Sequence, residues 1–372
     1  MTTHNSTIDL IASAARVLEA GQAPTGAFIA SPNFPEYRFA WLRDGSFCAL
    51  AMDALDDTAS ARAFHQWVTD VVLSNESQIT TVVSALREGR SPSKSQYLPT
   101  RYTLDGQLES AASGASNPAE SWPNFQLDGY GTWIFSLYSH FEGQALPKEF
   151  ERAVELVVHY LEATWELPCY DYWEEFGDRR HTSTLAAIAA GLRAGSRLLD
   201  RSGPDVVADH IMQFIRSNCS QDGHFTKGPE DARVDASLVS LCVPFALVGR
   251  SDPMMVKTIE KIRADLSSAS GGVRRYVGDT YYGGNPWILL TAWLGWYDKL
   301  TGRTPEYERA KEWIIAASAE SGDLAEQVVH EPQSLDHVQQ WIDRWGPVAD
   351  PLLWSHAKYV LMEKGSPAVS WY

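Results

Sequence analysis

Apolar residues recur every three or four positions along most of the chain, and this spacing predicts a protein built from α-helices. The first such segment spans residues 8–20 and ends at Gly21. Two more follow, one running through Phe47 and Ala54 and one beginning at Asp57. The remaining predicted helices, several of which begin with proline, cover residues 132–141, 147–164, 184–199, 204–215, 235–248, 253–266, 286–300, 305–319 and 351–362.

The connections between these helices suggest how they are arranged. The pattern gives about twelve helices and no convincing run of alternating strand residues. Some connections are short, which favours antiparallel neighbours, whereas others are long, above all residues 88–124. A ring of paired helices would bring the long loops to one mouth, where chemistry could take place. A superhelical solenoid is the alternative, but it predicts a repeated motif, and none is visible.

Composition narrows the classes of partner. The 372 residues are 44% hydrophobic and include 14 Trp, 15 Tyr and 13 Phe. This aromatic surplus suits a core, and it also suits sugar binding, in which rings stack on the apolar faces of the sugar. A formal net charge of −16 argues against nucleic acid and against an anionic membrane, because binding phosphate needs a basic face.

Neither a membrane span nor a bound ion is predicted. No apolar run is long enough to cross a bilayer, and no secretory signal is visible at the N-terminus, so a cytoplasmic location is expected. The cysteines lack C-x-x-C spacing, and no cluster of His, Cys and carboxylate residues has ligand spacing. We therefore expect no metal and no cofactor, while the oligomeric state is left open.

The strongest candidate chemistry lies in residues 170–177, Tyr-Asp-Tyr-Trp-Glu-Glu-Phe-Gly, just before a long helical segment. Glu174 and Glu175 stand side by side among aromatic residues. Apolar surroundings disfavour a charged carboxyl group, so Trp173 and the neighbouring carboxylate are expected to raise the pKa of Glu174 and keep it protonated. A surface pair of glutamates beside core aromatics is the simpler alternative.

Four further segments combine polar and aromatic residues in loops or at helix starts. In residues 41–44 (Trp-Leu-Arg-Asp), the arginine and aspartate could grip vicinal sugar hydroxyls, or form only a salt bridge at a helix start. Residues 122–131 begin with Trp122 and could be a capped loop end. Residues 274–287 gather arginine, aspartate, glycine and aromatic residues in one loop. Glu326, a lone carboxylate after a helix, would by itself be a surface residue.

Together these segments resemble glycoside hydrolase family fifteen, the glucoamylase family. The Trp-x-Arg-Asp run, the Trp-Glu-Glu-x-x-Gly run, the Asp-Thr-Tyr-Tyr-Gly-Gly-Asn-Pro-Trp run, the Glu-Gln pair at 326–327 and the Trp-Ser-His-Ala run at 354–357 occur in the order typical of the family. They cover roughly residues 35–362. Residues 102–109 and 126–131 are similar to the bacterial branch, and five ordered motifs argue against chance agreement.

The resemblance implies an all-α fold, a single (α/α)6 barrel over residues 1–372. It also implies removal of a terminal glucose from an α-linked sugar with inversion, Glu174 being the general acid and Glu326 the general base that activates water. The other matching positions would bind substrate. Arg43, Asp44 and Arg275 would hold the terminal glucose, and Trp173 and Glu175 would contact the sugar beyond the scissile bond. Trp41, Trp122 and Trp287 would shape the pocket, and Tyr281 would also contact the substrate.

Departures from the family guide the choice of substrate. The sequence has neither the starch-binding module of fungal members nor the N-terminal β-domain common in bacterial ones, and residues 177–182 differ from the fungal pattern. A short soluble oligosaccharide is therefore expected. The leading hypothesis is an exo-acting α-glucosidase for α-1,6 sugars such as isomaltose and isomalto-oligosaccharides. An α-1,4 glucoamylase or maltose-type hydrolase and a trehalase stay open, as does a catalytically silent sugar-binding protein of this fold.

Overall fold

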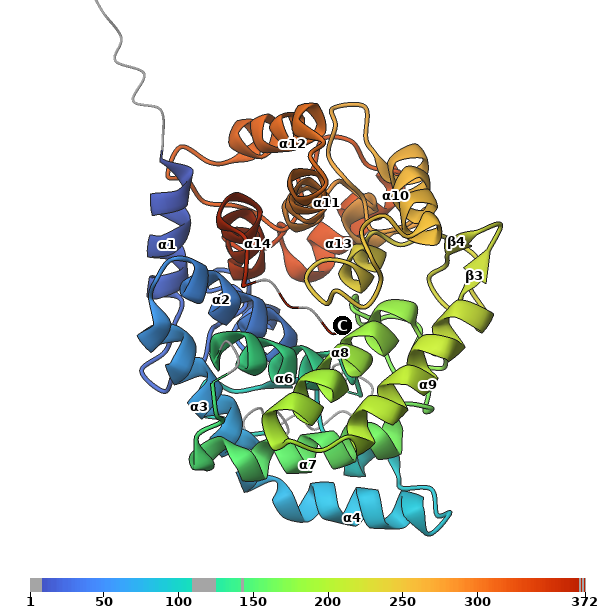
Figure 1. Cartoon of the computed structure of the whole chain (residues 1–372). Coiled ribbons are helices and arrows are strands. Elements are labelled where there is room, and N and C mark those ends of the chain that lie inside the picture. Colours follow the sequence, from blue (N-terminus) through green and yellow to red (C-terminus); the bar gives the residue numbers. More distant parts are fainter. Residues whose placement is uncertain (1–8, 109–124, 142–143, 368, 370, 372) are drawn as a thin grey trace, which may run out of the picture.

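The computed structural model describes residues 9–108, 125–141, 144–367, 369 and 371, and it has the mostly helical architecture of an (α/α)6 barrel (Figure 1). Six inner elements contact one another in a closed ring, in the order α2, α6, α8, η4, α11 and α14. The predicted fold class is thus confirmed. The inner elements are α2 (Leu42–Ala54), α6 (Asp128–Phe141), α8 (Thr182–Leu199), the 3-10 helix η4 (Ala236–Leu241), α11 (Ile288–Leu300) and α14 (Leu353–Lys364).

A second layer of helices packs around this ring. In it, α3 lies against α2, α7 and α9 against α8, α10 against η4, α12 against α11 and α1 against α14. These outer helices are α1 (Leu10–Ala20), α3 (Thr58–Ser74), α7 (Lys148–Thr164), α9 (Gly203–Asn218), α10 (Pro253–Leu266) and α12 (Thr304–Ala317). In the described part of the chain, no helix combines the length and the apolar character needed to cross a membrane.

Inner and outer helices differ in how much of their surface they bury. Helix α8 is buried throughout residues 182–196 and α2 throughout residues 42–52, because neighbours surround them. The outer helix α7 instead buries one stripe and exposes the opposite face, as expected for an amphipathic helix. Its apolar periodicity is correspondingly clear, with buried residues that include Phe150, Val154, Val157 and Leu161.

Two glycines let the inner helices α6 and α8 approach to backbone contact. A Cβ atom on Gly131 would lie 2.2 Å from the carbonyl oxygen of Ala187, and one on Gly191 would lie 2.6 Å from the Cα of Gly131. Such distances leave no room for a side chain at either position. The small residues of α8 therefore set the width of the inner ring on this side.

One predicted helix is wrong. Residues 235–248 form the short 3-10 helix η4, followed by turns, in place of a continuous α-helix. Asp235 caps η4 by accepting a hydrogen bond from the backbone N–H of Ser237. Pro244 explains the early end, because proline lacks the N–H that a helix needs and disfavours the helical conformation at the residue before it.

Two helices were not predicted. Helix α4 (Glu76–Arg87) packs against α7 with a buried stripe that includes Ile79 and Val82, and α13 (Leu335–Trp345) is amphipathic although none of its residues is fully buried. The remaining elements are the antiparallel pairs β1 (Ala40–Trp41) with β2 (Arg101–Tyr102) and β3 (Ser220–Gln221) with β4 (His224–Phe225), and the 3-10 turns η1 (Pro35–Tyr37), η2 (Lys94–Gln96) and η5 (Tyr281–Gly283). Of the long predicted loop, residues 109–124 lie outside the described residues.

Candidate active site

A cavity of about 670 Å³ opens where the chain enters the inner helices. Its walls come from the first turn of α2, the segments before α8 and α11, the start of α14, and the chain between α12 and α13. Trp122 lies outside the described residues. All the other predicted site residues line this one cavity: Trp41, Arg43, Asp44, Trp173, Glu174, Glu175, Arg275, Tyr281, Trp287 and Glu326.

Glu174 is held at one of its two carboxyl oxygens. The indole N–H of Trp41 donates to Oε1 over 2.9 Å, and Nη2 of Arg43 lies 3.5 Å from the same oxygen. Burial raises the pKa of Glu174, and the nearby charge of Arg43 works in the opposite direction. The group is therefore positioned firmly, with its protonated form favoured by the removal of water.

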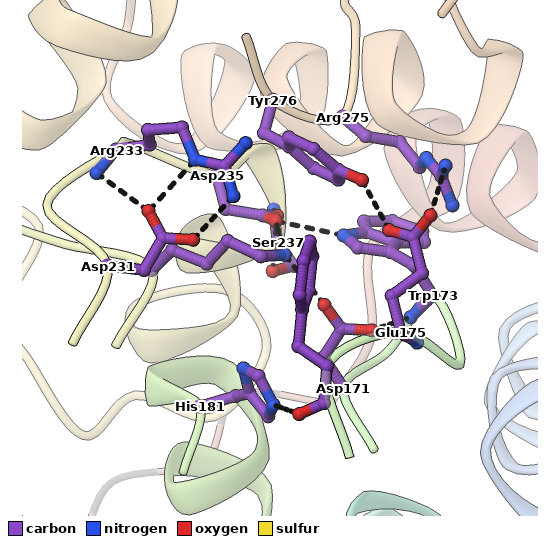
Figure 2. Close-up of polar contacts among 12 residues, drawn as sticks. Asp171, Trp173, Glu175, His181, Asp231, Arg233, Asp235, Ser237, Arg275 and Tyr276 are labelled. Atoms are coloured by element: carbon purple, nitrogen blue, oxygen red, sulfur yellow. Dashed lines mark hydrogen bonds and ion pairs between the residues drawn. The ribbon is translucent and has the colours of Figure 1, made fainter. Parts of the chain in front are cut away.

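The loop that carries Glu174 is fixed by a buried aspartate. Oδ1 of Asp171 accepts hydrogen bonds from the backbone N–H groups of Trp173 and Glu175, each over 2.9 Å (Figure 2). Glu174 itself has a φ of 60°, a left-handed conformation that only a well-anchored loop holds at a non-glycine residue. The Asp171 carboxylate thus sets the backbone from which both glutamates project.

A buried lysine ties this loop to η4. Nζ of Lys227 lies 2.7 Å from Oδ2 of Asp171 and 2.6 Å from Oδ2 of Asp235. Asp235 also accepts the indole N–H of Trp173 over 2.9 Å (Figure 2). Burial alone would lower the pKa of Lys227, but the two carboxylates raise it above its usual value. The lysine is charged, and it holds two parts of the barrel mouth together.

The predicted cause of the pKa shift at Glu174 needs correction. Glu175 interacts with other groups: its Oε2 accepts a hydrogen bond from the hydroxyl of Tyr276, and its Oε1 lies 3.4 Å from Nη2 of Arg275 (Figure 2). Neither Glu175 nor Trp173 is among the main influences on the pKa of Glu174. Burial by the whole pocket raises it, and this could not be read from the neighbouring residues in the sequence.

Arg43 and Asp44 form the core of a buried ion-pair network. Nε of Arg43 lies 3.2 Å from Asp44, and its Nη1 lies 2.9 Å from Oδ2 of Asp128, the first residue of α6. The guanidinium centre lies 4.8 Å from the ring centroid of Trp354. Burial raises the pKa of Asp44 to about 6, and the charge of Arg43 limits that rise. The salt bridge between Arg43 and Asp44, which was the simpler of the two interpretations of the sequence, is thus present, and both residues also line the cavity.

Glu326 occupies a different kind of environment. The hydroxyl of Tyr37 donates to its Oε1 over 3.0 Å, and the hydroxyls of Tyr37 and Tyr281 are 2.8 Å apart. Within the described residues its Oε2 is buried and has no hydrogen-bond partner. Burial raises the pKa of Glu326 to about 8, against the lowering effect of the Tyr37 hydrogen bond and of the charge on Arg275. Its backbone N–H bonds the carbonyl of Ala349, which fixes the segment.

The cavity contains residues that the sequence did not assign. Trp354 belongs to a quoted family motif but was given no role, and Tyr37, in η1, was not singled out from the sequence. Three of the remaining ones lie on α13, whose helix was not predicted, while Tyr172 lies inside the carboxylate loop and Glu36 lies in η1. Lining residues missed in this way are Glu36, Tyr37, Tyr172, Trp341, Arg344, Trp345 and Trp354.

The arrangement places two carboxyl groups from distant segments on one cavity, Glu326 buried and Glu174 partly buried. Glu174 and Glu326 do not share a hydrogen bond, yet they lie close enough together that the charge of Glu174 raises the pKa of Glu326. One group can therefore protonate a bound molecule while the other withdraws a proton from water. Among the described residues, one cluster of His and Asp has donor atoms close enough for a metal ion, and it lies outside this cavity.

Several known proteins are similar to this chain in sequence and in architecture. The family model described as Glycosyl hydrolases family 15 matches residues 9–346. The chain is 40% identical over 354 residues to Isomaltose glucohydrolase of Kribbella flavida, an alignment that covers 93% of this chain and 89% of that protein. It is 26% identical over 333 residues to Trehalase 2 of Sulfolobus acidocaldarius, covering 82% of this chain and 56% of that one. The fold superimposes on a glycosidase variant in complex with glucose with a TM-score of 0.89, at 37% identity and 96% coverage of both chains.

Proposed function

The chain belongs to glycosyl hydrolases family 15 and is a glycoside hydrolase, and on this premise we propose that it is an exo-acting α-glucosidase that inverts the anomeric configuration. The observation that carries the proposal is the pair of carboxyl groups on one cavity, the buried Glu326 and the partly buried Glu174. We propose Glu174 as the general acid and Glu326 as the general base. Residues 1–372 would form one catalytic domain.

Glu174 is suited to protonate the leaving oxygen. Trp41 and Arg43 both contact Oε1, and we propose that Oε2 carries the transferable proton. As the glycosidic C–O bond breaks, this proton moves to the departing sugar oxygen, and the carboxylate that forms is stabilised by the adjacent guanidinium. Arg43 therefore opposes protonation of Glu174 and stabilises the carboxylate that forms on proton transfer.

Glu326 is suited to activate water. Its Oε1 is held by Tyr37, while Oε2, without a partner in the described residues, is available to accept a proton from a water molecule. The water oxygen then bonds to the anomeric carbon from the face opposite the leaving group, and glucose departs as the β-anomer. An inverting arrangement requires the two carboxyl groups to stand about 6.5–9.5 Å apart, with room for that water.

The shape of the site favours attack at a chain end. Charged groups that can hold hydroxyls gather on the α2 side, where Arg43 and Asp44 are buried, and aromatic side chains close the rest of the wall. A single pocket of this size accepts one or two sugar rings. We propose that Arg43, Asp44 and Arg275 bind the terminal glucose, and that Trp173 and Glu175 contact the sugar beyond the scissile bond.

We propose α-1,6 linked sugars, isomaltose and short isomalto-oligosaccharides, as the substrates. Support comes from the 40% identity to Isomaltose glucohydrolase over most of both chains. Trehalase 2, at 26% identity, supports a trehalase as the second candidate, and an α-1,4 glucoamylase activity is the third. The four cysteines are buried and free, which supports a reducing compartment such as the cytoplasm.

The stereochemical experiment tests the assignment of Glu326. Proton NMR during the first minutes of isomaltose hydrolysis should show β-glucose first, with α-glucose following by mutarotation. Initial α-glucose would require a nucleophile close to the anomeric carbon and carboxyl groups about 5–5.5 Å apart. That outcome would contradict the proposed role of Glu326.

A substrate panel tests the linkage. We expect kcat/KM to be highest for isomaltose or isomaltotriose, lower for maltose and trehalose, and lowest for soluble starch. Trehalose in first place would favour the second candidate, and starch above every disaccharide would contradict the small-substrate proposal. Glucose binding without hydrolysis of any sugar would support a catalytically silent protein instead.

A further inference from the structure

Three side chains that can bind a metal meet at the end of the barrel opposite the cavity. Asp53 lies in the last turn of α2, His140 in the last turn of α6, and His65 in the outer helix α3. Asp53 follows Asp44 by nine residues, about 13 Å along a helix that rises 1.5 Å per residue. The cluster is therefore separate from the sugar pocket, and none of its members lines that pocket.

His65 is the unusual member of this cluster. It is 0% exposed, and neither of its ring nitrogens has a hydrogen-bond partner among the described residues. A buried polar group without a partner destabilises a protein by roughly 1–3 kcal/mol. Packing alone would be served better by phenylalanine or leucine, so the imidazole at this position calls for another explanation.

The neighbours of His65 supply the rest of a coordination site. Nδ1 of His140 lies 2.9 Å from Oδ1 of Asp53, and the ring centroids of His65 and His140 are 5.2 Å apart. One donor atom from each of the three residues can be chosen so that all lie within 4.8 Å of one another. Asp53 and His140 are slightly exposed, with side-chain exposures of 9% and 7%, so an ion could enter from solvent.

We propose that Asp53, His65 and His140 bind one zinc ion, with water as the fourth ligand. Two imidazoles and a carboxylate form a ligand set typical of Zn²⁺, with bonds of about 2.0–2.2 Å. Tetrahedral bonds of that length place ligand atoms about 3.4 Å apart, so donor atoms that lie within 4.8 Å of one another must approach by up to about 1.4 Å when the ion binds.

The electrostatics of the cluster suit a metal. A metal binds the neutral form of histidine through a ring nitrogen, and both ring nitrogens of His65 are buried without a partner among the described residues. The carboxylate of Asp53 then offsets part of the ionic charge. Bound zinc would join the inner helices α2 and α6 to the outer helix α3, so the site is structural, and sugar hydrolysis does not depend on it.

Metal titration of the chelator-treated full chain tests the proposal. We expect one Zn²⁺ per chain by isothermal titration calorimetry, a Tm that rises with the logarithm of free zinc, and visible absorption bands of four-coordinate Co²⁺ when cobalt is used as the probe. His65→Phe should abolish all three signals, because it keeps the ring but removes a ligand. Asp53→Asn keeps the shape of the side chain and can still bond His140, and it should weaken metal binding strongly. This second variant keeps the test informative if His65→Phe fails to fold.

A matched control separates this site from surface histidines. His210 is exposed on α9, and His210→Gln should leave the stoichiometry and the Tm response unchanged. Absence of zinc and cobalt binding by the wild-type chain would overturn the proposal. So would one metal per chain that survives in both His65→Phe and Asp53→Asn, since the ion would then bind elsewhere.

Discussion

Glu174 and Glu326 are the same residue type in the same cavity, but their surroundings differ in kind. Glu174 stands in a network of charged groups: Arg43 lies beside it, and the loop below it is held by Asp171 and Lys227. Glu326 stands among neutral donors, with the hydroxyl of Tyr37 at its Oε1. Burial raises the pKa of both. The main opposing influence is the charge of Arg43 at Glu174, whereas at Glu326 it is the hydrogen bond from Tyr37, followed by the charge of Arg275.

The comparison shows how one pocket can prepare two carboxyl groups for opposite tasks. A guanidinium beside an acid stabilises the carboxylate that remains after the proton has been given away. Tyrosine hydroxyls beside a base orient it without neutralising it, so the carboxylate stays reactive. With its pKa raised to about 8 by burial, Glu326 is mostly protonated at pH 7. Activation of water needs the ionised form of Glu326, which the hydrogen bond from Tyr37 and the charge of Arg275 both favour.

The largest expected effect separates the two roles by substrate. Glu174→Gln should lower kcat on isomaltose by about 10²–10⁴, the usual contribution of general acid catalysis, and should spare α-glucosyl fluoride, whose leaving group hardly needs a proton. Glu326→Gln should impair both substrates, because both need activated water. Steady-state assays of the two variants on the two substrates decide this, and equal losses on both substrates in Glu174→Gln would contradict its role as the acid.

The second prediction concerns stability against pH. The pKa of Glu326 is about 8 in the folded chain and about 4.5 when unfolded, so its protonated form stabilises the fold fully below pH ~4.5, and this stability is lost as pH rises through about 8. Glu326→Gln mimics the protonated form. Urea unfolding should therefore find the variant equal to the wild type near pH 4.5 and more stable at pH 8.5, by at most ~4–5 kcal/mol at ~1.4 kcal/mol per pKa unit. A constant difference across this range would contradict the buried, proton-binding state of Glu326.

A third change tests whether the charged network near Glu174 binds substrate. Asp44→Asn keeps the shape and removes the charge that pairs with Arg43. Loss of a charge-assisted hydrogen bond to sugar is worth ~1.5–3 kcal/mol, so kcat/KM should fall about 10- to 100-fold with a small change in Tm. Asp209→Asn, which alters an exposed partner of Arg193, serves as the control. If inactivity follows only from a collapsed Tm, the pair has a structural role alone.

The smallest effect on activity is expected from a change beside Glu326, the proposed base. Tyr37→Phe removes a hydrogen bond that favours ionised Glu326, so the pKa of that group should rise. The acidic limb of the kcat/KM profile, which reports ionisation of the base, should then move to higher pH by less than ~1 unit. Tyr297→Phe, which removes a buried hydroxyl bonded to the carbonyl of Arg250, is a control that should leave the profile unchanged. A shift toward lower pH would contradict the proposed environment.

Much of this architecture could be predicted because it is encoded locally. Outer helices such as α7 bury one stripe, and proline or aspartate marks several helix starts, so periodicity and capping reveal them. The site motifs were visible for a related reason: the Arg43-Asp44 pair, the two adjacent glutamates and residues 274–287 are each contiguous in the chain. The prediction of a helix over residues 235–248 was wrong. It rested on the spacing of apolar residues, which continues past Pro244 although a proline at that position disfavours an α-helix.

Only the tertiary structure determined the relations between residues that are far apart in the sequence. The pKa of Glu174 depends on burial by the entire pocket, and the network of Lys227 with Asp171 and Asp235 joins two distant segments. Asp53, His65 and His140 have no ligand spacing along the chain, yet the barrel brings them together. Sequence patterns record the period of a helix and the residues it carries, whereas dielectric environment, charge pairing and metal geometry depend on distances that only the folded chain fixes.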